Sequence, residues 1–134
     1  METTYIDKLA WVYLQDRRVL MVRSKGKDIF YTPGGKREEG ESDLEALMRE
    51  VKEELTVDLM PGTVAHVATL EAPAHGKPEG AMVRNTFYQG TFEGEPRPAA
   101  EIEELEWFAY EDRERCSSVN QLLLEHLKGK DLID

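Results

Sequence analysis

The sequence predicts an α/β protein of the α+β type, in which a mixed β-sheet is covered on its faces by helices. Two strand-like segments precede the first predicted helix, and a consecutive group of strands lies between the first and the second helix. Strands that follow one another without an intervening helix argue against a purely parallel sheet, because parallel neighbours need long crossover connections. The order of the elements therefore favours a mixed sheet with helices packed on its faces.

The predicted strands are short runs rich in β-branched, aromatic and aliphatic residues. The polar turn QDRR separates the first two strands. A further apolar run, IFYTPGGK, ends at a proline and two glycines, which interrupt regular structure. The strands are predicted over residues 8–14, 19–24, 63–71, 82–92 and 104–110.

Two helices are predicted from periodicity and capping signals. In the first, apolar residues recur at helical spacing, and Ser42 followed by Glu45 matches a capping box, so this helix should begin near Ser42. The second is predicted over residues 118–128, with a serine cap before it and Gly129 at its end. The apolar positions of the first helix are Leu44, Leu47, Met48, Val51 and Leu55.

Length and composition limit the possible classes of protein. The 134 residues predict a single domain over residues 1–134, and a hydrophobic share of 40% is enough for a core. The formal net charge of −10, from 17 basic and 27 acidic residues, argues against nucleic acid and against an anionic membrane surface as partners.

The expected location is the cytoplasm. Cys116 is the only cysteine, which excludes a disulfide within the chain. The N-terminus lacks the features of a signal peptide, and no apolar run approaches the roughly 20 residues of a membrane span. Nothing near Cys116 marks it as a nucleophile, and His75, in a polar loop, is expected to be solvated.

The acidic residues concentrate in one segment, where residues 38–54 contain seven Glu and one Asp. At about 100° per residue, Glu50, Glu53 and Glu54 fall in one sector of the helix, roughly 120° from the apolar sector. Like charges at these spacings destabilise a helix by about 0.2–0.5 kcal/mol per pair. The segment is therefore either a solvated face or a site for a hard divalent cation, which prefers oxygen ligands. The preceding PGG can bring a backbone carbonyl close as a further oxygen ligand.

This segment resembles the Nudix box over residues 35–57, which read GKREEGESDLEALMREVKEELTV. The box is Gly, five residues, Glu, seven residues, Arg-Glu, an aliphatic residue, any residue, Glu-Glu, any residue, Gly and an aliphatic residue. Two strands before the box, PGGK at its entry and a later acidic loop leading to a strand with Trp107 are also similar to the family. Thr56 departs from the pattern, because the family has glycine there. The matching residues are Gly35, Glu41, Arg49, Glu50, Val51, Glu53, Glu54 and Val57.

The resemblance implies an α/β/α sandwich formed by a single Nudix hydrolase domain. Proteins of this family hydrolyse a diphosphate bond in a nucleoside diphosphate joined to another group, and they need Mg²⁺ or Mn²⁺. Glu41 and Arg49 are expected to pair and to brace the loop. The metal ligands that the resemblance implies are the carbonyl of Gly34 and the carboxylates of Glu50, Glu53 and Glu54.

A carboxylate must also accept the proton of the attacking water. For this role we favour Glu50 or Glu53 slightly over Glu101, which lies on a later loop, and its neighbours Glu103 and Glu104 stay open as alternatives.

Arg23 and Lys36 are candidates for contacts with substrate phosphates. A guanidinium matches phosphate oxygens well, and Arg23 lies at the end of the second predicted strand. The alternative for both residues is an ordinary solvated side chain.

Thr56 bears on the geometry of the helix end. Glycine at this position commonly lets a helix end in the left-handed conformation, which a β-branched residue resists. We therefore expect the helix end to take another path, without effect on the carboxylates.

The favoured function is metal-dependent hydrolysis of a small nucleotide such as a (deoxy)nucleoside triphosphate. ADP-ribose, sugar nucleotides and capped RNA stay open as substrates, although the compact length and the net acidity disfavour RNA. The alternative is a catalytically weak or inactive module that binds nucleotides or sugar-nucleotides as a sensor. A merely acidic surface helix is the third interpretation. The resemblance also makes a homodimer a candidate assembly.

Overall fold

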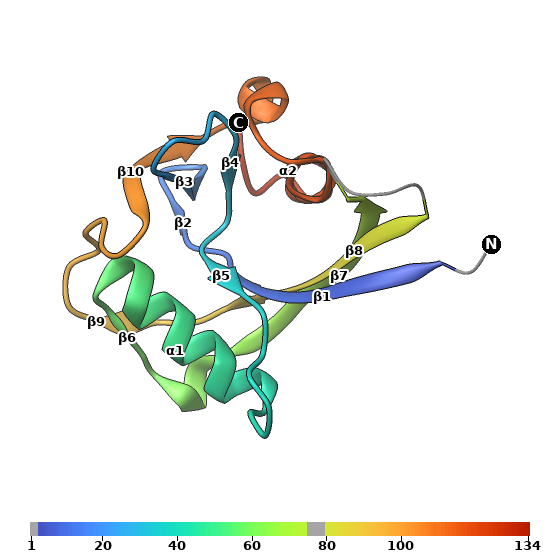
Figure 1. The fold of residues 1–134 in the computed structure, drawn as a ribbon. Coiled ribbons are helices and arrows are strands. Elements are labelled where there is room, and N and C mark those ends of the chain that lie inside the picture. Colours follow the sequence, from blue (N-terminus) through green and yellow to red (C-terminus); the bar gives the residue numbers. More distant parts are fainter. Residues whose placement is uncertain (1–2, 75–79) are drawn as a thin grey trace.

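The computed structural model describes residues 3–74 and 80–134, so His75 lies outside the described residues. Figure 1 shows a layer of strands between two helices, with α1 (Asp43–Leu55) on one side and α2 (Ser118–Gly129) on the other. Two short 3₁₀ helices are also present: η1 (Pro61–Thr63) precedes the strand β7 (Ala65–Pro73), and η2 (Tyr110–Arg115) precedes α2. No helix within the described ranges is long and apolar enough to cross a membrane.

The strands between the helices are mostly short. They are β1 (Thr4–Trp11), β2 (Leu14–Gln15), β3 (Arg18–Ser24), β4 (Phe30–Tyr31), β5 (Gly34–Gly35), β6 (Asp58–Leu59), β7 (Ala65–Pro73), β8 (Ala81–Gln89), β9 (Phe92–Glu93) and β10 (Ile102–Phe108).

The strands form two main sheets and one small one. The first sheet has the order β5-β1-β8-β7, the second has the order β10-β3-β2 with β4 beside β3, and β6 pairs with β9. Strands β1 and β8 run parallel, whereas the pairs around them, β1–β5 and β7–β8, run antiparallel. The first sheet is therefore mixed, the other two are antiparallel, and this arrangement with helices on both sides confirms the predicted α+β fold.

Side-chain alternation along the strands supplies both faces of the layer with apolar residues. In β1, Leu9 and Trp11 join the apolar cluster beneath α1, whereas Ala10 and the following Val12 join the cluster beneath α2. Strand β3 divides its residues in the same way. The two helices therefore close separate apolar clusters on opposite faces of one layer.

Two predicted strands are interrupted in the structure. The run 8–14 is divided between β1 and β2, and the run 82–92 is divided between β8 and β9. At the second break, the indole Nε1 of Trp11 donates to the carbonyl of Gly90 at 3.2 Å, and the chain then leaves β8 to pair with β6. The hydrophobic pattern continues through both breaks, so periodicity alone did not reveal them.

The start of α1 agrees with the prediction, whereas its end does not. The capping box is present, because the N–H of Glu45 donates to Ser42 Oγ at 3.1 Å and the N–H of Ser42 donates to Glu45 Oε1 at 3.0 Å. The prediction for the other end was wrong. Thr56 adopts the left-handed conformation, with φ 63° and ψ 20°, and its N–H donates to the carbonyl of Lys52. A contact from Thr56 Oγ1 to the carbonyl of Glu95, at 3.4 Å, helps to hold it there.

Candidate active site

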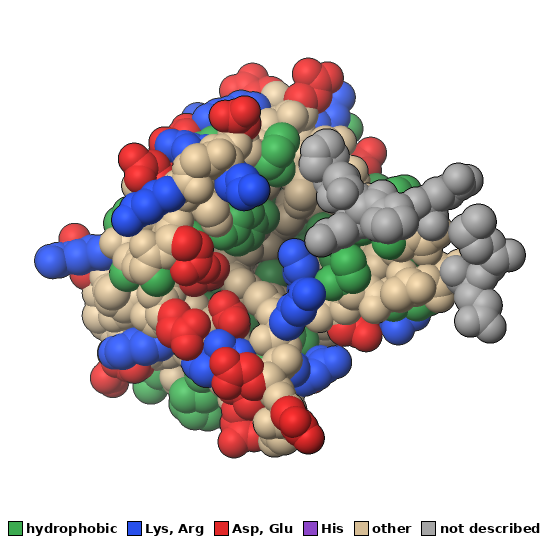
Figure 2. Space-filling model, in the orientation of Figure 1, with side chains coloured by type: hydrophobic (Ala, Val, Ile, Leu, Met, Phe, Trp, Pro, Cys, Tyr) green, Lys and Arg blue, Asp and Glu red, His purple; other side chains and the backbone are tan. Residues whose placement is uncertain are grey.

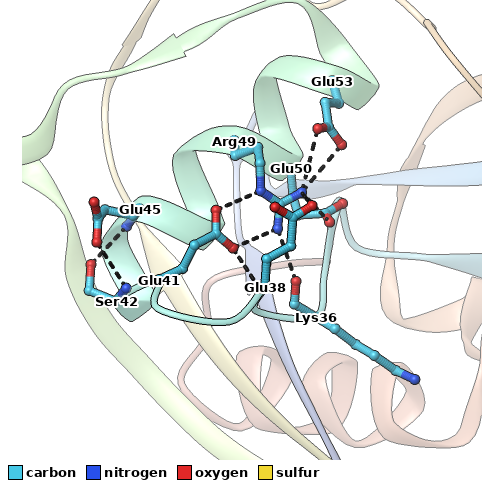
Figure 3. A network of polar contacts seen from close by, with 8 residues as sticks. All are labelled: Lys36, Glu38, Glu41, Ser42, Glu45, Arg49, Glu50 and Glu53. Carbon is cyan, nitrogen blue, oxygen red and sulfur yellow. Dashed lines mark hydrogen bonds and ion pairs between the residues drawn. The ribbon is translucent and has the colours of Figure 1, made fainter.

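Arg49 on α1 lies at the centre of a network of acidic side chains (Figure 3). Its Nε and Nη2 donate to the two carboxylate oxygens of Glu41 at 2.6 and 2.8 Å, and Nη2 also donates to the carbonyl of Lys36 at 3.1 Å. Its Nη1 donates to Glu50 at 2.9 Å and lies 3.4 Å from Glu53. The expected pair of Glu41 and Arg49 is thus present, and it ties the loop before α1 to the helix.

Glu41 is held as an anion by these contacts. The guanidinium of Arg49 and the backbone N–H of Glu38 lower the pKa of Glu41 to about 2. A carboxylate with so low a pKa is a poor proton acceptor at neutral pH. Glu41 therefore suits the bracing role that the resemblance implied.

The three glutamates of α1 differ in exposure. The side chain of Glu53 is 53% exposed and that of Glu50 is 17% exposed, whereas Glu54 is only 2% exposed. At about 100° per residue, Glu54 lies nearest to the apolar sector of the helix and Glu53 lies farthest from it. The carboxylates therefore form a series that runs from the core to the solvent.

Glu54 is a buried carboxylate with one backbone partner. Its Oε1 accepts a hydrogen bond from the N–H of Gly34 at 2.8 Å. Burial raises the pKa of Glu54 to about 8, and the charges of Glu50, Glu101 and Glu53 add to this effect, whereas the Gly34 N–H opposes it. Burial also raises the pKa of Glu50. A cation placed among these groups would relieve the cost of ionising them.

The two glycines of β5 permit a close approach of the chain on both sides. A Cβ atom on Gly34 would lie 1.9 Å from the carbonyl oxygen of Leu9, and one on Gly35 would lie 2.6 Å from Cδ of Glu50. Any larger residue would displace either β1 or the Glu50 carboxylate. The glycine pair therefore lets β5 lie between β1 and the acidic face of α1.

A pocket of about 300 Å³ lies beside this glycine pair, lined by parts of β1, β8 and the start of α2. Figure 2 shows acidic side chains gathered over α1 and a hollow in the surface beside them. Two buried carboxamides line the pocket, Asn85 from β8 and Asn120 from α2. Asn120 Oδ1 accepts from Thr32 Oγ1 at 2.8 Å, and its Nδ2 donates to Ser117 Oγ at 2.7 Å.

Neither asparagine was predicted from the sequence as a site residue. A signal was present in β8, where Val83, Asn85 and Phe87 occupy one face of the strand and the two apolar residues pack in the cluster beneath α2. A polar residue between two inward apolar positions is the kind of exception that marks a polar site in a core.

Comparison with known families identifies the chain. A model of the NUDIX domain matches residues 8–124. The chain belongs to the Nudix family. The match extends well beyond the Nudix box on both sides and confirms the prediction of a Nudix-type hydrolase.

Solved structures of Nudix proteins share the fold. The MutT Nudix hydrolase from Burkholderia pseudomallei has a TM-score of 0.77 and 24% identity, over 92% of this chain and 98% of that one. The MutT protein from Methanosarcina mazei Go1 has a TM-score of 0.74 and 20% identity, over 98% of both chains. The E. coli dihydroneopterin triphosphate pyrophosphohydrolase has a TM-score of 0.69 and 22% identity, over 96% of this chain and 97% of that one. A search of curated proteins finds no match.

The residues of the Nudix box fit a hard divalent cation by their chemistry. Within the described residues, no three acidic, His or Cys side chains already stand in a ligating arrangement. The Nη1 of Arg49 lies between Glu50 and Glu53 instead. The donors are carboxylate oxygens, which such cations prefer, and two of the carboxylates have raised pKa values that a cation would lower. The carbonyl of Gly34 stays a predicted ligand.

Glu101 joins the carboxylates of the Nudix box although it is distant in sequence. It precedes β10, and its charge adds to the effect of burial in raising the pKa values of Glu50 and Glu54. Of its neighbours, Glu104 accepts a hydrogen bond from Arg23, so its carboxylate is engaged.

The two predicted phosphate contacts lie in different surroundings. The guanidinium of Arg23 donates to Glu104 at 2.5 Å and to the carbonyl of Lys27 at 2.8 Å, so it is not simply solvated. Lys36 lines the pocket, and its side chain extends away from the carboxylates in Figure 3. Contact with phosphate stays a prediction for both.

Proposed function

We propose that this Nudix protein hydrolyses a diphosphate bond in a small nucleotide, with a (deoxy)nucleoside triphosphate as the favoured substrate. The proposed cofactor is Mg²⁺ or Mn²⁺, held by Glu50, Glu53, Glu54 and the carbonyl of Gly34. The observation that carries the proposal is that Glu54 and Glu50 lie against Gly34 and Gly35, and these two glycines line a pocket of about 300 Å³.

The residues have separate tasks in this proposal. A bound divalent cation neutralises phosphate oxygens and makes a bound water easier to deprotonate. Glu50, Glu53 or Glu101 orients the water and accepts its proton. Arg49 fixes the entry loop to α1 through Glu41 and the Lys36 carbonyl, so that the carboxylates keep their positions.

The pocket suits the part of the substrate that is not phosphate. Gly34, Gly35 and Lys36 line it, and Gly34 and Gly35 also contact or adjoin the glutamates of α1. A nucleotide with its phosphates over the carboxylates would place its nucleoside in the pocket, within reach of Lys36. The volume of about 300 Å³ is typical of a site for a small ligand.

The test is a comparison of the wild-type protein with Glu53→Gln on a panel of substrates in the presence of Mg²⁺. The panel contains nucleoside triphosphates, ADP-ribose, sugar nucleotides and dihydroneopterin triphosphate, because a structural neighbour is named for that last compound. Products are separated by ion-exchange chromatography, which identifies the bond that is cut. Glu125→Gln is the matched control, since Glu125 is an exposed residue of α2.

We expect turnover of a triphosphate by the wild type and by Glu125→Gln. Glu53→Gln should lose at least about 100-fold in kcat, the usual scale for removing an acid–base group or a ligand of the reacting centre. The same analysis of Glu50→Gln and Glu101→Gln ranks the candidate proton acceptors. Nucleotide binding without turnover in the wild type would overturn hydrolysis in favour of a sensor.

A further inference from the structure

Asn85 has a buried carboxamide oxygen that forms no hydrogen bond. The residue is only 5% exposed, and its Oδ1 has no partner within the described residues. Leaving a buried polar atom without a partner is unfavourable, and most such atoms in folded proteins are satisfied. The unpaired Oδ1 of Asn85 in the wall of a pocket is therefore a candidate acceptor for a hydrogen bond from a ligand.

None of the described residues around Asn85 forms a hydrogen bond with its Oδ1. It lies on the face of β8 that packs beneath α2, with Val83 and Phe87 on either side along the strand. Its antiparallel neighbour in β7 is Leu70, which is also apolar. On its other side, the parallel neighbour in β1 is Lys8, and both residues line the pocket beside the glycine pair.

Asn120, the other carboxamide of the pocket, is already engaged. Its Oδ1 accepts from both the N–H and the Oγ1 of Thr32, and its Nδ2 donates to Ser117. Asn120 therefore braces the start of α2 against the chain before β5. Of the two carboxamides, Asn85 is the one whose oxygen is left for a ligand.

We propose that Asn85 is a specificity-determining residue whose carboxamide hydrogen-bonds to the edge of the nucleobase in the pocket. This inference rests on the proposed function, because it assumes that the substrate is a nucleotide with its phosphates over the carboxylates. A carboxamide presents one acceptor beside one donor, and it pairs with a base edge that has the complementary donor and acceptor. The ligand class is therefore a planar heterocycle with a donor next to an acceptor.

The test measures binding without catalysis. Adenosine, guanosine, cytidine and uridine 5′-monophosphates are titrated into the full-length protein in EDTA, and dissociation constants are obtained by calorimetry. Asn85→Leu removes the hydrogen-bonding groups while keeping a branched side chain, and Asn85→Ala serves if leucine does not fit. Thr86→Val is the matched control, because it removes a hydroxyl from the neighbouring residue on the opposite face of β8.

The wild type and Thr86→Val should prefer one base over the least favoured base by about tenfold or more, within the usual range for a bidentate contact. In Asn85→Leu this preference should shrink to less than about threefold. The same variant should melt at a higher temperature than the wild type in the absence of ligand, because it no longer buries an unpaired oxygen. A structural role for Asn85 would instead lower the melting temperature.

Two results would overturn the inference. One is a base preference that survives in Asn85→Leu, and the other is an equal loss of affinity for all four bases, which is expected if the oxygen only holds an ordered water. Because the titrations need neither metal nor turnover, they can fail while hydrolysis is observed. Conversely, base-selective binding by a protein that hydrolyses nothing would support Asn85 and contradict the proposed function.

Discussion

Glu54 is a residue that the protein buries at a cost to its own stability. It is 2% exposed, and within the described residues its carboxylate accepts a hydrogen bond only from the N–H of Gly34. Burying a carboxylate without a neighbouring cation is unfavourable, so the group keeps its proton instead of ionising. A raised pKa in a site rich in carboxylates is a common property of functional residues. The proposed cation would stabilise the ionised carboxylate of Glu54 and so offset the free-energy cost of burying its charge.

Replacing Glu54 with Gln should change the pH dependence of stability in the metal-free protein. The pKa of Glu54 is raised from 4.5 to about 8, so between these values the folded protein holds a proton that the unfolded chain has lost. The stability that this group contributes is complete below pH 4.5 and declines as pH rises toward 8, by at most about 1.4 kcal/mol per pH unit. Gln keeps an acceptor for the Gly34 N–H and does not titrate, so this decline should be absent.

Urea unfolding in EDTA at a series of pH values measures this effect. Above pH 8, Glu54→Gln should be more stable than the wild type, and with Mg²⁺ it should be far less active. Glu125→Gln should follow the wild-type profile, because its side chain is exposed. Parallel profiles for the wild type and Glu54→Gln would show that Glu54 does not titrate abnormally.

At the scale of the element, α1 is defined by what fixes its two ends. The capping box fixes its start, and the left-handed Thr56 fixes its end. Between them the helix holds its glutamates against β5, where Gly34 contacts Glu54 and Gly35 adjoins Glu50. The end is the strained one, since a β-branched residue in the left-handed region is costly.

Thr56→Gly should therefore stabilise the protein by about 1 kcal/mol, the scale of the strain that a left-handed conformation imposes on a residue with a Cβ. The exposed contact to the Glu95 carbonyl is long, at 3.4 Å, and its loss should subtract little. Thr56→Ala is the matched control, because it loses the same hydroxyl but keeps a Cβ. Thermal or urea unfolding measures both variants. A Thr56→Gly protein no more stable than Thr56→Ala would mean that the backbone at this position is not strained.

At the scale of the whole molecule, the sequence predicted the features that depend on residues close together in the chain. The capping box at Ser42 and the acidic sector of α1 depend only on residues a few positions apart, and both are present. The left-handed Thr56 depends in part on Glu95, and the parallel pairing of β1 with β8 joins segments far apart in the chain. The alternation along β8 marks Asn85 as an inward polar residue, but the pocket that it lines forms only where β8 and α2 come together. Such long-range contacts leave no periodic signal in the sequence.

The charge of the whole molecule leads to the last prediction. The chain carries a net charge of −10, and the pKa of Glu54 is raised by burial and, to a smaller extent, by repulsion from neighbouring carboxylates. Any salt can partly screen such repulsion. A specific metal site should stabilise the folded protein beyond the effect of screening. MgCl₂ should therefore raise the melting temperature more than NaCl does at equal ionic strength. Mg²⁺ at a hundredfold excess over its Kd should add about 2.7 kcal/mol to the free energy of unfolding. Glu53→Gln should lose most of this difference while keeping the NaCl effect, whereas Glu125→Gln should keep both. If the two salts stabilise the wild type equally, magnesium acts on the acidic cluster only by screening, and the carboxylates of α1 do not form a metal site.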